Sequence, residues 1–204
     1  MTKSNKRWLQ AHRKDQFVKQ ARDSHYRSRA VYKLLEIDKR DRLFKPGQTV
    51  VDLGAAPGGW SQYAVERVGH MGKVFALDIL PMEPIASVSF LQGDFTEESV
   101  FKVCLESLDP GRADLVISDI APNLTGIRTT DQARSMYLAE LACDFACKVL
   151  NPGGDLLIKL FQGEGVDEFK RELRAHFQKV IIRKPQASRD SSREFYILAR
   201  GYKV

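Results

Sequence analysis

Apolar residues recur along the chain with two different spacings, and segments of the two kinds alternate. Short runs rich in Val, Ile, Leu and Phe predict seven strands, at 49–54, 73–79, 88–92, 114–118, 155–160, 179–184 and 194–200. Apolar residues at helical spacing predict helices from Ser28 to Leu43 and at 58–68, 97–107, 131–150 and 165–177. Residues 1–25 are expected to be flexible or loosely helical.

The order of these segments predicts the architecture. Strands that alternate with helices form βαβ units, in which parallel strands are covered by helices on both faces. The link from Pro185 to Arg193 is too short for a crossover helix, so the last two strands should pair antiparallel. The expected fold is α/β and Rossmann-like, a seven-stranded mostly parallel sheet with an antiparallel last strand. A length of 204 residues fits one such domain with a short appendage.

A glycine-rich turn follows the first predicted strand and has the sequence Gly54-Ala55-Ala56-Pro57-Gly58-Gly59. Three glycines and a proline within six residues let the backbone pass close to a ligand. The spacing is not the G-x-G-x-x-G of dinucleotide sites, and Pro57 has no N–H to donate to a phosphate. The turn therefore favours a nucleotide-like ligand without a phosphate group, such as S-adenosylmethionine (SAM).

Four carboxylates fall in or at the ends of four successive predicted strands. They are Asp52, Asp78, Asp94 and Asp119. Asp78 lies where an acid can bond ribose hydroxyls, and Asp94 could accept from an adenine amino group. Each acid alone could be a helix cap or a turn former. Because the carboxyl ends of parallel strands line one crevice, four together predict a ligand site there.

The positive charge of the chain is concentrated near its N-terminus. The formal net charge is +6, but residues 1–45 hold fourteen Lys and Arg against five Asp and Glu. A second basic stretch carries Lys179, Arg183, Lys184, Arg189 and Arg193 against Asp190 alone. Basic residues interleaved with Trp8, Phe17 and Tyr26 suit a polyanion, most often nucleic acid. The alternative is that these residues form a solvated tail that only aids solubility. On the charge distribution we divide the chain into a basic N-terminal arm, 1–26, and a catalytic domain, 27–204.

Cysteine content and hydropathy argue against metal and membrane. The cysteines Cys104, Cys143 and Cys147 form no paired C-x-x-C motif, so no metal is expected and they should be small buried residues. No apolar run approaches the ~20 residues of a membrane helix. We expect a cytoplasmic monomer.

Four segments together resemble the RrmJ/FtsJ-type ribose 2′-O-methyltransferases. They are Asp52–Gln62, Ser118–Asn123, Leu157–Phe161 and Ser192–Tyr196. The resemblance extends from about Arg27 to the C-terminus, and every motif matches. It implies a class I SAM-dependent methyltransferase fold. Within the family the chain most resembles the bacterial RlmE branch, which methylates a uridine ribose in the A loop of 23S ribosomal RNA in the assembled 50S subunit.

The resemblance also implies the site residues. The family's catalytic tetrad corresponds to Lys33, Asp119, Lys159 and Glu194, and its SAM contacts correspond to Gly58, Trp60, Asp78, Asp94 and Asp119, beside Asp52 and Gly54 of the turn. A lysine can take the ribose proton only when it is neutral, whereas an ordinary lysine has a pKa of about 10.4. We expect Lys159 to be the base, Lys33 and Glu194 to orient the ribose, and Asp119 to hold the SAM amine and Lys159. Without the resemblance, Lys33 would pass as an exposed helix residue, Glu194 as a salt-bridge partner and Trp60 as core.

Three other functions were considered. A dehydrogenase is disfavoured because the chain lacks both G-x-G-x-x-G and a Tyr-x-x-x-Lys pair. A base methyltransferase is disfavoured because Asp119-Ile120-Ala121-Pro122 differs from the amino-methylating motif and no cysteine lies at a strand end of the crevice. A non-enzymatic RNA-binding or assembly factor with a SAM fold is disfavoured by the complete tetrad.

Overall fold

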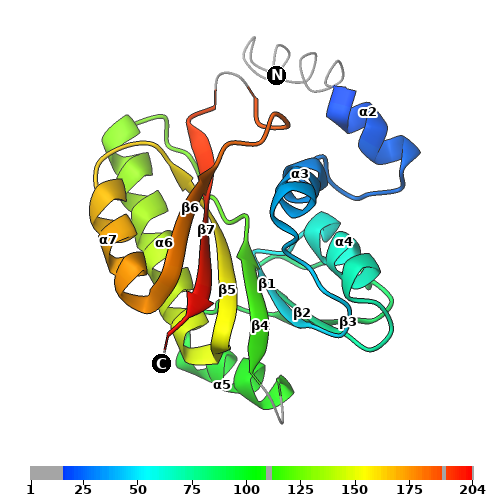
Figure 1. Cartoon of the computed structure of the whole chain (residues 1–204). Helices are drawn as coiled ribbons and strands as arrows, with labels where there is room; N and C mark the ends of the chain where they lie inside the picture. Colours follow the sequence, from blue (N-terminus) through cyan, green and yellow to red (C-terminus); the bar gives the residue numbers. More distant parts are fainter. Residues whose placement is uncertain (1–15, 109–111, 190–191, 204) are drawn as a thin grey trace.

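The chain folds around one seven-stranded sheet with helices on both of its faces (Figure 1). The structure is a computed structural model and describes residues 16–108, 112–189 and 192–203. The strands are β1 (Thr49–Leu53), β2 (Lys73–Asp78), β3 (Val88–Gln92), β4 (Ala113–Ser118), β5 (Leu150–Phe161), β6 (Phe177–Arg183) and β7 (Glu194–Tyr202). The helices are α2 (Gln16–Asp23), α3 (Val31–Asp41), α4 (Gly59–Val68), α5 (Glu98–Ser107), α6 (Arg128–Val149) and α7 (Val166–His176).

The strand order in the sheet is β3-β2-β1-β4-β5-β7-β6. β1 is parallel to β2 and β4, β2 to β3, and β4 to β5. The last strand, β7, lies between β5 and β6 and is antiparallel to both. The predicted fold class is therefore confirmed, including the antiparallel pairing of the two final strands.

Predicted boundaries differ from the observed ones by up to five residues, and two of the differences have a local explanation. Helix α6 begins at Arg128 rather than at 131, since Asp131 accepts hydrogen bonds from the backbone of Thr125 and Gly126 and so holds the chain that enters the helix. Strand β5 begins at Leu150, which pairs with Ala113, while Asp155 pairs with Leu115. Residues 151–154, which lie between the predicted helix 131–150 and the predicted strand 155–160, therefore form a bulge inside the strand.

The sheet separates two apolar cores. One contains side chains of α5, α6 and α7, and the other contains side chains of α2, α3 and α4. Strand alternation explains the division at β1, because Val51 and Leu53 face the first core and Val50 faces the second. By the same alternation Asp52 shares the face of Val50 and is buried beneath α4.

The described part of the basic arm packs on the domain. Ala21 of α2 is buried in the core formed with α3 and α4. Phe17 packs on Tyr32 with ring centroids 5.6 Å apart, and Arg29 lies over the Phe17 ring. Residues 1–15, with Trp8, fall outside the described residues, and the division of the chain at residue 26 stays a prediction.

Candidate functional site

A cavity of about 430 Å³ lies at the carboxyl ends of β1, β2, β3 and β4. Its walls come from the glycine turn, from the chain after β2 and β3, and from the segment after β4. The lining residues are Gly54, Ala56, Leu77, Asp78, Ile79, Leu80, Gly93, Asp94, Phe95, Asp119, Ile120, Ala121, Pro122, Asn123 and Leu138. Three of the four acids predicted at strand ends thus face one cavity, and Gly54 joins them.

Asp78 fixes the shape of this cavity. One carboxylate oxygen accepts a hydrogen bond from the Ala56 backbone N–H at 2.9 Å, and the other accepts from the Leu80 N–H at 2.8 Å. Asp94 similarly accepts from the Thr96 N–H at 2.9 Å. The cavity therefore combines carboxylate oxygens with apolar side chains such as Ile79 and Leu138, which suits a ligand with both hydroxyl groups and an apolar surface.

Asp52 lies beneath the turn and does not line the cavity. Its Oδ2 accepts a hydrogen bond from the Ser61 hydroxyl at 2.6 Å, while Oδ1 is buried without a partner among the residues that the structure describes. Burial raises the pKa of Asp52 to about 7, and the nearby charges of Asp119 and Asp78 add to that rise. Asp52 therefore connects β1 to the start of α4, the two elements that flank the glycine turn.

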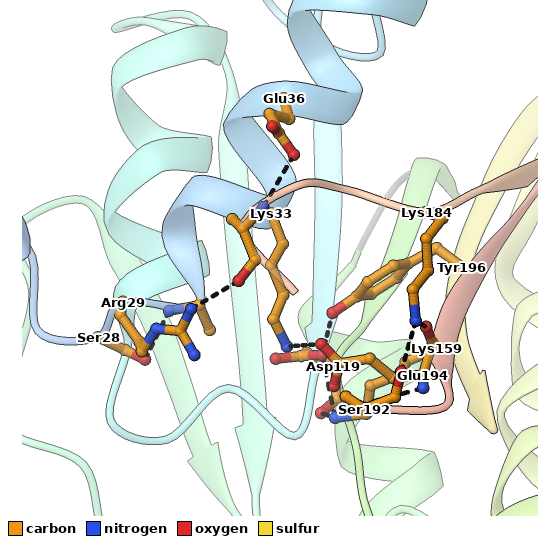
Figure 2. A network of polar contacts seen from close by, with 12 residues as sticks. Ser28, Arg29, Lys33, Glu36, Asp119, Lys159, Lys184, Ser192, Glu194 and Tyr196 are labelled. Carbon is orange, nitrogen blue, oxygen red and sulfur yellow. Dashed lines mark hydrogen bonds and ion pairs between the residues drawn. The ribbon is translucent and has the colours of Figure 1, made fainter. Parts of the chain in front are cut away.

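Lys159 and Asp119 form one ion pair beside the cavity (Figure 2). The Nζ atom of Lys159 lies 3.0 Å from Oδ1 of Asp119 and also donates to the Asp119 backbone carbonyl. The Lys159 side chain is only 7% exposed, against 18% for Asp119. A nearly buried lysine is thus held by one residue at the edge of the cavity.

Lys33 and Glu194 form a second, shorter ion pair that faces the first. Nζ of Lys33 lies 2.6 Å from Oε1 of Glu194, and both side chains are nearly buried. Lys33 comes from α3 and Glu194 from the first residue of β7. Figure 2 shows the four side chains converging in one place, so the structure brings together all four residues that the resemblance implies.

Tyr196 is a member of this cluster that the sequence analysis does not single out. Its hydroxyl donates a hydrogen bond to Oδ1 of Asp119 at 2.6 Å, and Lys33 Nζ lies 5.8 Å from its ring centroid. Burial, together with the charges of Asp119 and Glu194, raises the pKa of Tyr196 well above its ordinary value. It is the last residue of Ser192–Tyr196, the fourth segment that resembles the family, and that is the sequence signal that could have indicated it.

Gly58 and Trp60 are not among the residues that line the cavity. A Cβ atom at Gly58 would point toward Met82 and Ile85, and the indole of Trp60 packs on the Tyr196 ring at 5.8 Å. The Trp60 Nε1–H donates to the carbonyl of Ala30 at 2.9 Å. A contact of either residue with a ligand would therefore have to come from the backbone.

The basic stretch from 179 to 193 is partly used inside the fold. Arg183 binds Asp41 through two hydrogen bonds, of 2.5 and 2.6 Å. Lys184 donates to the carbonyls of Ser192 and Glu194, and so holds the chain at the start of β7. Lys179, Arg189 and Arg193 are exposed.

The part of the chain that the structure describes has neither a metal-binding cluster nor a helix that could cross a membrane. In residues 16–108, 112–189 and 192–203, no cluster of three or more His, Cys, Asp or Glu could hold a metal ion. Over the same ranges no helix has the length and apolar character to span a bilayer. The cysteines are free thiols, of which Cys104 and Cys143 are buried and Cys147 is partly exposed.

Comparison with known proteins identifies the family. A family model described as FtsJ-like methyltransferase matches residues 26–202. The chain belongs to the FtsJ-like methyltransferase family. Among curated relatives of this methyltransferase, the ribosomal RNA large subunit methyltransferase E of Marinobacter nauticus is 59% identical over 203 residues, which cover 100% of this chain and 98% of the relative. The protein of the same name from Alkalilimnicola ehrlichii is 60% identical over 198 residues, which cover 97% of this chain and 95% of the relative.

A solved structure supports the same assignment of this methyltransferase. The crystal structure of a protein from Plasmodium falciparum, assigned as a ribosomal RNA methyltransferase, matches with a TM-score of 0.80 and 30% sequence identity. The match covers 87% of this chain and 98% of the other. The antiparallel arrangement of β7 therefore occurs within a methyltransferase fold.

The family implies SAM as the methyl donor, and the cavity fits it. A volume of about 430 Å³ lies in the range of small-molecule sites. Carboxylates at Asp78 and Asp94 can accept from ribose hydroxyls and an amino group, and Asp119 can accept from an amine. Apolar walls suit the adenine ring and the thioether chain. A cavity that fits the donor thus lies next to the Lys159–Asp119 pair.

Proposed function

We propose that this protein is a SAM-dependent ribose 2′-O-methyltransferase that modifies a uridine in the A loop of 23S ribosomal RNA, within the assembled large ribosomal subunit. One observation carries the proposal: two nearly buried lysine–carboxylate pairs meet at the edge of the donor cavity. The names of the relatives support a ribosomal RNA substrate, and the resemblance to ribose methyltransferases supports the 2′-hydroxyl as the acceptor.

Lys159 is the general base in this proposal. Bound SAM supplies a methyl group on a positively charged sulfur, so the protein has to align the acceptor oxygen and remove one proton. Once Lys159 has lost its own proton, its amine would take the 2′-hydroxyl proton as the oxygen bonds to the methyl carbon. The bond from that carbon to sulfur would break, and the sulfur would leave as the neutral thioether of S-adenosylhomocysteine. Asp119 holds Nζ through two oxygen atoms, which fixes its direction relative to the cavity.

The remaining members of the tetrad would position the acceptor. Lys33 and Glu194 offer a donor and an acceptor 2.6 Å apart, and a ribose hydroxyl lying alongside the pair could accept from Lys33 and donate to Glu194. Asp119 also lines the donor cavity, so its carboxylate would bind the methionine amine of SAM as well. One residue then connects the positions of methyl donor and acceptor.

Donor binding is assigned to the cavity residues. Asp78 would accept from the ribose hydroxyls of SAM and Asp94 from its adenine amino group, while the glycine turn approaches the donor through its backbone at Gly54 and Gly58. Trp60 would contribute through its backbone, and Asp52 would support the turn. No metal takes part in the proposed mechanism.

Ribosomal RNA would bind through its phosphates and its shape. The basic arm and the segment 179–193 supply the positive charge, and the exposed Lys179, Arg189 and Arg193 are the side chains of the second segment available for it. Arg183 is committed to Asp41 and contributes to the fold instead. In this proposal the enzyme acts as a monomer in the cytoplasm, where bacterial ribosomes are assembled.

Replacing the proposed base separates chemistry from donor binding. Lys159→Ala should lower methyl transfer to ribosomal particles about 10³-fold, since a positioned base contributes roughly 10²–10⁴-fold. Its dissociation constant for SAM should stay within a few-fold of wild type. Transfer of labelled methyl groups and isothermal titration calorimetry measure the two quantities, and mass spectrometry of digested RNA identifies a 2′-O-methyl nucleoside.

Lys102→Ala, at an exposed position on α5, is the control and should leave both quantities unchanged. Full transfer by Lys159→Ala would rule out its role as the base. A methyl group found on a base rather than on the ribose would refute the proposed acceptor, and no transfer by wild type would favour a pure binding factor.

A further inference from the structure

The segment between β2 and β3, residues 79–87, forms one wall of the donor cavity without being a helix or strand itself. It contributes Ile79 and Leu80 to the lining. Its two prolines, Pro81 and Pro84, have no N–H group to donate. Its ends are held by hydrogen bonds from Gln92 Nε2 to the Ile79 carbonyl and from the Val88 N–H to the Ile85 carbonyl. A short wall of this kind needs an outside attachment to keep a defined position next to the ligand.

Arg27 provides such an attachment. Its Nη1 donates to the carbonyl of Glu83 at 2.5 Å and to that of Pro57 at 3.3 Å, and its Nη2 donates to the carbonyl of Pro84 at 2.8 Å. Pro57 belongs to the glycine turn, whereas Glu83 and Pro84 belong to the 79–87 segment. A single guanidinium that does not itself line the cavity therefore joins two separate walls of it.

Arg27 is itself held in place by the body of the domain. Its backbone N–H donates to Oε1 of Gln62 on α4 at 2.9 Å, and Nε2 of the same Gln62 donates to the carbonyl of His25. The preceding Tyr26 donates from its hydroxyl to Glu66 at 2.7 Å. The guanidinium thus starts from a fixed backbone, so its three bonds require little further ordering.

At Gly58 the glycine turn lies in close contact with the 79–87 segment. Gly58 has a φ of 106°, and a Cβ atom there would come within 2.6 Å of Ile85 Cδ1 and 2.9 Å of Met82 Sδ. The same position would lie 3.3 Å from Nη1 of Arg27. The turn, the 79–87 segment and Arg27 therefore meet at one point, where a shift of one moves the others.

We propose that Arg27 is a positioning residue for the methyl donor: it fixes the 79–87 segment against the glycine turn and so sets the affinity for SAM. The identity of the ligand rests on the proposed function. Arg27 does not line the cavity and so acts through the walls that it joins. Asp78 makes the matching connection on the inner side, since it bonds both Ala56 and Leu80.

The chemistry of arginine gives the proposal a sharp test. A guanidinium carries five N–H groups in a planar fork and can reach three carbonyl oxygens at once, whereas a lysine ammonium is a compact point charge. Arg27→Lys keeps the charge but loses the fork. If Arg27 positions the donor site, the Arg27→Lys and Arg27→Ala variants should lose affinity for SAM to a similar extent. If Arg27 instead attracts RNA phosphates, Lys should retain most of the function.

Isothermal titration calorimetry with SAM alone, on Arg27→Lys and Arg27→Ala, is the primary measurement. We expect the dissociation constant for SAM to rise about tenfold in both. At saturating SAM the kcat should stay within about twofold of wild type, and the KM for ribosomal particles should not change. Arg171→Lys, at an exposed position of α7, is the matched control and should leave every quantity unchanged.

Hydrogen exchange by mass spectrometry tests the physical cause directly. Without SAM, the amides of residues 79–87 should exchange faster in both Arg27 variants, while those of α6 should exchange as in wild type. Thermal unfolding shows whether Arg27→Ala remains folded. If it does not, the measurements on Arg27→Lys alone test the proposal.

Three results would overturn the proposal. They are an unchanged affinity for SAM in Arg27→Lys, unchanged exchange in residues 79–87, and a raised KM for ribosomal particles that Lys restores. Failure of the proposed function would look different, because wild type would then bind SAM tightly, respond to Arg27 substitution, and still transfer no methyl group to ribosomal RNA. A wild type that does not bind SAM would refute both.

Discussion

The donor cavity and the tetrad lie side by side but are built in different ways. The cavity uses the ends of neighbouring parallel strands, and its key contacts join residues close to the turn, such as Asp78 with Ala56 and Leu80. The tetrad takes its members from α3, from the end of β4, from β5 and from β7. The first site follows from the general topology of a parallel sheet, whereas the second depends on how one particular strand is inserted.

The insertion of β7 determines the tetrad. In the β5–β7 register Lys159 is opposite Tyr196, and Phe161 is opposite Glu194. If β7 lay at the outer edge of the sheet, beyond β6, Glu194 and Tyr196 would be one strand further from Lys159. The antiparallel strand thus converts a general nucleotide-binding sheet into one that can hold an acceptor beside the donor.

Asp119 belongs to both regions, so its replacement should produce the largest effect. In Asp119→Asn the side chain keeps its size but Lys159 loses its counterion. If Asp119 binds the donor as proposed, the donor amine also loses a charged partner. We expect kcat to fall roughly 10³-fold and the dissociation constant for SAM to rise about tenfold, in line with the loss of charge-assisted hydrogen bonds. Single-turnover methyl transfer and calorimetry measure the two effects.

Asp114→Asn is the control for this prediction. Asp114 lies in the same strand, near its opposite end, and its carboxylate bonds the Thr49 N–H and the side chain of Asn151. It should leave transfer and SAM affinity unchanged. If Asp119→Asn altered only one of the two quantities, Asp119 would belong to one region alone and the connection between them would have to run through another residue.

The sequence alone predicts more of the residues of the donor cavity than of the tetrad and its surroundings. The glycine turn and the acids at 78, 94 and 119 follow from strand order and local chemistry, because every parallel strand carries its end to the same edge. Lys33 lies in an ordinary amphipathic helix, and only the resemblance to a family identified it. Tyr196 was missed, since it reads as one more aromatic residue in a buried strand. The position of β7 between β5 and β6 was also not predicted, because a short link fixes antiparallel pairing without saying on which side the strand lies.

A change confined to the donor region should separate it from the tetrad. Gly54 has a φ of 75°, and a Cβ atom there would collide with the side chain of Ile120 on the cavity wall. Gly54→Ala should lower the free energy of unfolding by about 2–4 kcal/mol, from backbone strain and overpacking together. SAM should bind about tenfold more weakly, with kcat at saturating SAM nearly unchanged. Chemical denaturation and calorimetry provide the values.

Gly47→Ala isolates the backbone part of that effect. Gly47 has a similar φ of 82°, and nothing lies within 4 Å of a Cβ placed there. It should lower the free energy of unfolding by about 1–2 kcal/mol, the cost of a left-handed conformation, and leave SAM affinity unchanged. Equal losses of SAM affinity in both variants would show that backbone strain, rather than the displacement of Ile120 in the cavity wall, lowers the affinity for SAM.

The smallest expected effect comes from the acceptor region, where Tyr196→Phe removes a single hydroxyl. Asp119 then keeps Lys159 as a partner but loses the 2.6 Å bond that directs its carboxylate. We expect kcat to fall about fivefold to tenfold while SAM affinity stays within twofold. Because burial and the neighbouring carboxylates hold the pKa of Tyr196 above its ordinary value, the hydroxyl stays protonated near neutral pH, so the ratio of mutant to wild-type kcat should not vary between pH 6 and 8.

Tyr63→Phe is the matched control for Tyr196→Phe. The Tyr63 hydroxyl donates to the buried carboxylate of Asp38 at 2.7 Å, on α4 and away from the cavity. Both variants should lose about 1.5–3 kcal/mol of unfolding free energy, the usual contribution of a hydrogen bond to a charged group. Only Tyr196→Phe should slow methyl transfer. Equal slowing by both would mean that general loosening of the fold is responsible, whereas slowing by Tyr196→Phe alone assigns its hydroxyl to the alignment of Asp119 with Lys159.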